Sequence, residues 1–145
     1  MGAHKRSFGG YYAVALAAQV SRDELPAIVS VAPPIHHSFD RPPPWLPVER
    51  HSWFASLSLD AQGALNVNTQ QPELLVVQSL PDPLCVIEDT YLLAERGIVA
   101  DTLIYAQDFH TAMLNGRDHL AFSIDWLRKR VDGRPLRTGD DGVRS

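Results

Sequence analysis

The chain has 145 residues, of which 45% are apolar and 21% charged, a composition typical of one folded domain. Its formal net charge is −4, with the acidic excess between positions 41 and 116, which argues against a protein that follows nucleic-acid phosphates. The single cysteine excludes an intrachain disulfide, and no apolar run approaches the length of a membrane span, so we expect a cytoplasmic protein without membrane contact.

The first part of the chain is interpreted as strands joined by loops. Residues 1–9 are expected to form a mobile N-terminus. Residues 11–20 are apolar and carry aromatics that suit a strand, although their alanines also suit a helix. Residues 27–32 repeat this apolar character, and the following Pro33 and Pro34 end the predicted strand because proline has no N–H for a sheet.

A proline-rich loop over residues 33–51 is the most unusual segment, since it holds six of the chain's eleven prolines. A loop of this length in a small domain is usually functional or disordered. Pro43, Pro44, Trp45 and Leu46 could form a preordered apolar anchor for another protein, because tryptophan is enriched at binding hot spots and proline lowers the cost of ordering. The alternative is that these side chains pack on the domain's own sheet.

A β-hairpin is predicted next, with strands at residues 53–59 and 64–69 and a turn at 60–63. The predicted buried face consists of Trp53, Ala55, Leu57 and Leu59. Ser56 and Ser58 fall on the opposite, polar face, and neither is part of a G-x-S-x-G nucleophile motif.

Two further apolar runs are interpreted as strands, at residues 74–80 and, more briefly, at 84–87. Cys85 lies within the second run, where a thiol is usually a small buried apolar group rather than a nucleophile.

The last third of the chain is predicted to be helical, with helices at residues 89–96, 101–116 and 117–131 and a polar tail at 134–145. The core-facing stripe predicted for the last helix consists of Leu120, Ile124, Leu127 and Val131. Strands followed by helices indicate a single α+β domain, with an antiparallel sheet of about four or five strands in the N-terminal two-thirds packed by two or three C-terminal helices.

The histidines of the proline-rich loop are the first candidates for chemistry. His36, His37, Asp40, Glu49 and His51 are residue types that bind zinc or iron, but their spacing matches no compact metal motif. We therefore expect no metal and no cofactor, and keep a small metal-dependent hydrolase that uses these loop histidines as the alternative.

Two other features have simpler explanations. His110 could act as a base oriented by Asp108 or Glu95, but a histidine at the rim of a packed helix is commoner. Residues 128–130, Arg-Lys-Arg, could bind an anion, yet cations in the last turn of a helix also complement its dipole.

The absence of a recognisable catalytic motif favours a non-catalytic protein-binding module: an adaptor, inhibitor, immunity-type protein or assembly factor. Its expected partner is another protein, and self-association is open. An enzyme is the second hypothesis, and binding of nucleic acid ranks last.

Overall fold

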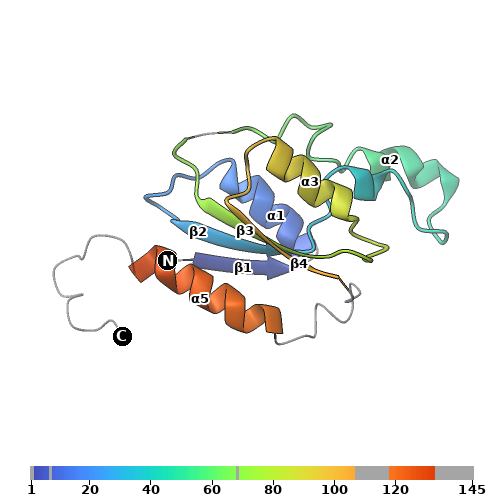
Figure 1. The fold of residues 1–145 in the computed structure, drawn as a ribbon. Coiled ribbons are helices and arrows are strands. Elements are labelled where there is room, and N and C mark those ends of the chain that lie inside the picture. Colours follow the sequence, from blue (N-terminus) through green and yellow to red (C-terminus); the bar gives the residue numbers. More distant parts are fainter. Residues whose placement is uncertain (1, 7, 68, 107–117, 133–145) are drawn as a thin grey trace.

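The computed structural model describes residues 2–6, 8–67, 69–106 and 118–132, and it shows a parallel sheet with helices on both faces (Figure 1). The strands, in their order across the sheet, are β1 (Gly2–Arg6), β2 (Ala27–Val31), β3 (Glu73–Ser79) and β4 (Asp101–Tyr105). The prediction of an antiparallel α+β domain was therefore wrong, because every strand pair is parallel and helices alternate with strands.

The register brings the ends of the strands together. Ala27 of β2 pairs with both Gly2 of β1 and Glu73 of β3, and β4 starts two residues further along, with Asp101 opposite Leu75. In a parallel sheet all carboxyl ends lie at one edge, so the loops that follow the strands also meet there.

The helices are α1 (Phe8–Ala17), α2 (His51–Ala55), α3 (Ile87–Glu95) and α5 (Asp118–Asp132), with short 3-10 turns at His37–Phe39 and Val48–Arg50. Figure 1 shows α1 and α3 on one face of the sheet and α5 on the other. Consecutive parallel strands joined by right-handed crossovers place their connecting helices on one face, which accounts for α1 and α3.

The central strands are buried on both faces. All five residues of β2 are buried, and so are all residues of β3 after Glu73. Strands covered on both sides are continuous apolar runs rather than alternating ones, and Val and Ile suit the pleated backbone. The strands predicted at 27–32 and 74–80 are confirmed for this reason.

The secondary structure predicted for the N-terminal segment was wrong. Residues 2–6 form a strand where a mobile N-terminus was expected, and residues 8–17 form a helix where a strand was expected. Gly10 explains the position of α1: a Cβ there would lie 2.8 Å from Ser30 Oγ and 3.0 Å from the Val31 carbonyl oxygen. The missing side chain lets α1 pack directly against β2, and the Ser30 hydroxyl donates a hydrogen bond to the Gly10 carbonyl.

The hairpin predicted over residues 53–69 is also absent from the described part of the chain. Residues 51–55 form α2, and the N–H groups of Ser56, Leu57 and Ser58 bond to carbonyls three or four residues back rather than to a neighbouring strand. Leu59 is buried as expected, but Trp53 is 53% exposed and Ser58 only 2% exposed. Apolar and polar residues alternate over only a few positions here, and so short a pattern is compatible with a series of tight turns as well as with a strand.

The last third of the chain combines confirmed and corrected predictions. The helices expected at 89–96 and 117–131 are α3 and α5. Residues 101–105 form β4 instead of starting a helix, and 84–87 lead into α3 instead of forming a strand. Residues 134–145 lie outside the described part of the chain.

The core-facing stripe of α5 is rotated from the predicted one. Its buried residues are His119, Ser123 and Trp126, whereas Ile124 is 48% exposed. Only a single face of α5 meets the sheet, and it is the face that carries the indole. Among the described residues, no helix has the length and apolar character required to cross a bilayer.

Candidate functional site

In sequence, the connection after β1 is shorter than the connections after β2 and β3. β1 ends at Arg6 and α1 begins at Phe8, so Ser7, which lies outside the described residues, is the one residue between them in sequence. The first N–H groups of a helix have no partner within it, so the start of α1 presents donors at this edge. Phe8 itself is 50% exposed.

A buried carboxylate follows β3 at the same edge. Asp82 is 4% exposed, and its Oδ1 accepts hydrogen bonds from the N–H groups of Leu84 (2.9 Å) and Cys85 (3.0 Å). These bonds fix the loop after β3 around the carboxylate. Cys85 is buried, as the sequence predicted.

A cavity of about 520 Å³ opens between these loops. Ligand pockets commonly enclose about 300–1,000 Å³, so this one has room for a small organic group. Its wall is mainly aromatic and aliphatic, formed by Phe8, Phe39, Pro42, Pro43, Pro44, Trp45, Phe54, Pro83, Leu84 and Val86. Polar atoms come from His37, Ser38 and Arg41, so the cavity suits an apolar group with a polar end.

Most of the residues predicted as a protein anchor belong to this cavity. Pro43, Pro44 and Trp45 line it, and Trp45 remains 79% exposed. Leu46 is half-buried and does not line the wall. The loop therefore neither packs fully on the sheet nor simply projects into solvent.

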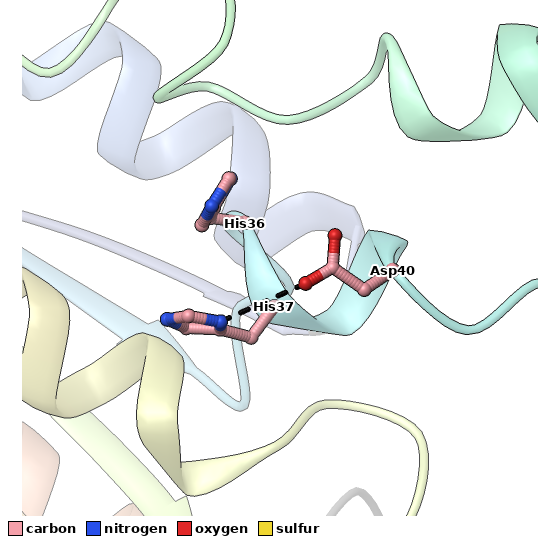
Figure 2. Close-up of side chains that lie close together, drawn as sticks. All are labelled: His36, His37 and Asp40. Atoms are coloured by element: carbon pink, nitrogen blue, oxygen red, sulfur yellow. Dashed lines mark ion pairs between the residues drawn. The ribbon is translucent and has the colours of Figure 1, made fainter.

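The loop histidines are only partly brought together. One ligand atom from each of His36, His37 and Asp40 lies within 4.8 Å of the others, and Figure 2 shows the three side chains around one turn. The His36 Nδ1 is 2.6 Å from Ser58 Oγ, and the His37 Nδ1 is 3.8 Å from Asp40 Oδ2. His51 is not part of the group, because its Nε2 contacts the Leu46 carbonyl. That the protein carries no stoichiometric metal stays a prediction.

The remaining candidates separate into two groups. His110 and Asp108 lie outside the described residues, and Glu95 is exposed at the last residue of α3. In α5, Lys129 forms an ion pair with Asp125, which supports the interpretation of the 128–130 cluster as a helix surface.

Neither Asp82, whose buried carboxylate follows β3 at the sheet edge, nor Ser7, the residue after β1 in the sequence, was predicted to have a role. Ser7 is followed by Phe8-Gly9-Gly10, the second half of a G-x-S-x-G motif, but Lys5 stands where the first glycine would be. The sequence does contain one signal for such residues. Ser7, Asp82 and His110 occur in this order, and each follows a segment that forms a strand.

No protein-family model matches the chain, and no curated protein matches it by sequence. Solved structures do match. They include an acylaminoacyl peptidase of Pyrococcus horikoshii, with a TM-score of 0.67 and 14% identity over 99% of this chain and 26% of the peptidase. The esterase domain of a Rhodothermus marinus protein has a TM-score of 0.59 and 20% identity over 90% of this chain and 61% of that domain. An esterase of Pyrococcus furiosus has a TM-score of 0.59 and 19% identity, covering 89% of this chain and 52% of the esterase.

These similarities establish the fold, and they overturn the prediction of a non-catalytic protein-binding module. The matched proteins are described as esterases and peptidases rather than adaptors or inhibitors. The chain spans between a quarter and about three-fifths of the length of these three neighbours.

Proposed function

We propose that the chain is a serine hydrolase that cleaves esters or amides of carboxylic acids with an apolar acyl group. The connection between β1 and α1 is the observation that carries the proposal, because one residue, Ser7, separates a parallel strand from a helix packed closely on the next strand. A nucleophilic serine in α/β-hydrolases occupies such a strand–turn–helix position, and its partners follow in the order Asp, then His. Asp82 after β3 and His110 after β4 fit that order.

Each residue would have a defined role in the reaction. Ser7 Oγ attacks the acyl carbon while His110 takes the hydroxyl proton, and the buried Asp82 carboxylate orients the imidazole. The backbone N–H of Phe8 donates to the oxygen that becomes negative. His110 returns its proton to the departing alcohol or amine, and water releases the acid by the same sequence of steps.

The cavity supports an apolar acyl group as the recognised part of the substrate. It lies beside Phe8, the residue after Ser7, and beside Pro83, the residue after Asp82. The neighbours that are esterases or peptidases support the same class of reaction. A cytoplasmic location is part of the proposal and rests on the lone, buried Cys85.

Hydrolysis of p-nitrophenyl acetate by the full chain tests this function. Ser7→Ala should lower kcat/KM by at least about 10³-fold, because loss of a nucleophile removes nearly all covalent catalysis. The control is Ser56→Ala, since Ser56 is exposed and its hydroxyl donates to the nearby Trp53 carbonyl. A fluorophosphonate probe should label the unaltered protein and the control but not Ser7→Ala. Equal activity of all three proteins would exclude Ser7 as the nucleophile.

A further inference from the structure

Asp89 has a buried carboxylate that is devoted to one turn of the chain. It lies in the first turn of α3 and is 0% exposed. Its oxygens accept hydrogen bonds from the backbone N–H groups of Ile35 (2.8 Å), His36 (3.0 Å), His37 (2.6 Å) and Ser38 (3.1 Å), and from Ser38 Oγ (2.5 Å). Burial of a carboxylate is unfavourable without such partners, so the turn and the carboxylate require one another.

Ser38 extends this contact to the loop after β3. Its hydroxyl donates to Asp89 and accepts a hydrogen bond from the N–H of Val86 at 3.1 Å. The other end of that loop is held by Asp82, whose Oδ1 accepts the N–H groups of Leu84 and Cys85. Residues 35–38 are thus fastened to residues 83–86.

Both fastened segments line the cavity, whose wall also includes Phe8 and Pro83, the sequence neighbours of Ser7 and Asp82. His37 and Ser38 belong to the first segment, and Leu84 and Val86 to the second. The distance between these segments sets the width available to an acyl group. We propose that Asp89 is a positioning residue that fixes this width and so selects acyl groups by size, an inference that rests on the proposed hydrolase function.

The bonding pattern requires a carboxylate rather than an amide. Oδ1 accepts two N–H groups, and Oδ2 accepts two N–H groups and a hydroxyl. Because an amide nitrogen cannot accept a hydrogen bond, Asp89→Asn would leave at least two of these donors facing another donor. The turn would then move away from α3 and from Val86.

The test measures hydrolysis of two esters by the full chain, p-nitrophenyl acetate and p-nitrophenyl 3-phenylpropionate, which differ in the size of the acyl group. Asp89→Asn should lower kcat/KM for the phenylpropionate about tenfold more than for the acetate, mainly through KM, since an apolar pocket discriminates by the fit of each added group. Ser38→Ala, which removes one bond of the same cluster, should shift the ratio in the same direction and serves where Asp89→Asn does not fold. The matched control is Asp125→Asn, because Asp125 is exposed on α5 across the sheet.

A merely structural role would lower both rates together by reducing the folded fraction, and an unchanged ratio in both variants would overturn the proposal. Equilibrium dialysis with the unreactive probe 3-phenylpropan-1-ol provides a readout without turnover. Asp89→Asn should weaken its binding about tenfold relative to Asp125→Asn. If the unaltered chain hydrolyses neither ester, the hydrolase proposal fails, while the dialysis still decides whether Asp89 shapes the cavity.

Discussion

The two faces of the sheet are covered in different ways. On one face, Ile28, Leu74 and Val76 pack in a core that also receives side chains from α1, α3 and the long crossover between β2 and β3. On the other face, the alternate residues of the same strands form a smaller core with Trp126 of α5. The cavity is lined mainly by elements of the first face, so selectivity for the acyl group should be separable from the stability that the second face provides.

The second face depends on a few contacts around one indole. Trp126 is 5% exposed, and its Nε1 donates to Asp101 Oδ2 at 2.7 Å. Arg130 covers the ring at 4.1 Å from its centroid and also bonds to the same Asp101 oxygen at 2.9 Å. Trp126 is the buried apolar side chain among the described residues of α5, and its indole links this helix to Asp101 of β4.

The largest effect is expected from Trp126→Ala. Removal of this buried side chain should lower the free energy of unfolding by about 3–5 kcal/mol, because the apolar contact and the packing of α5 are lost together. The ratio of kcat/KM between the acetate and phenylpropionate esters should not change in the molecules that remain folded, since the cavity is lined mainly by elements across the sheet. Urea denaturation and ester hydrolysis on the same preparation measure both quantities.

The control for this variant is Trp53→Ala. Trp53 is 53% exposed on α2, so its removal should have a much smaller effect on the midpoint of unfolding. A changed ratio of kcat/KM between the two esters for Trp126→Ala would show that the two faces are coupled and would contradict the separation.

The central strands were predictable from sequence, and the direction of their pairing was not. Residues 27–31 are apolar except for Ser30, residues 74–77 are all apolar, and prolines stand near both segments; such short apolar runs indicate a buried strand. The central pair is itself parallel, and residues 2–6 and 101–105, which were not predicted as strands, extend the parallel sheet on either side by pairing with β2 and β3. The alternation of apolar and polar residues near position 57 was interpreted as a β-hairpin, and this led to the wrong prediction of an antiparallel sheet.

The site was predictable only in part for a similar reason. The prolines and Trp45 marked the unusual crossover, and they do line the cavity. Ser7 and Asp82 carry no local signature beyond an incomplete motif, because their proposed roles depend on β1 and β3 lying in one parallel sheet, with β2 between them. Asp89 is the first residue of a predicted helix, and its bonds to residues 35–38 could not be predicted without the fold.

Ser58 offers an intermediate test on the first face. The sequence placed it on an exposed surface, but its hydroxyl is buried, lies 2.6 Å from His36 Nδ1 and accepts the N–H of Ala61. Ser58→Ala should cost about 1–3 kcal/mol of stability, because buried polar partners are left unsatisfied. Ile124→Ala, on the exposed side of α5, should cost less than Ser58→Ala in the same denaturation series. The reverse order would mean that the crossover contributes less to the first face than its burial indicates.

Trp45→Ala should have the smallest effect on stability and the clearest effect on specificity. The indole is 79% exposed, so its removal should change the free energy of unfolding by less than about 0.5 kcal/mol. It nevertheless lines the cavity, and its loss should lower kcat/KM for the phenylpropionate ester about tenfold while the acetate is little affected, as expected for one wall of an apolar pocket. Val48→Ala is a suitable control, since Val48 is 75% exposed in the same loop and does not line the cavity. A stability loss of several kcal/mol in Trp45→Ala would contradict this prediction. It would show that the loop between β2 and β3 belongs to the core of the first face instead of serving mainly as a wall of the cavity.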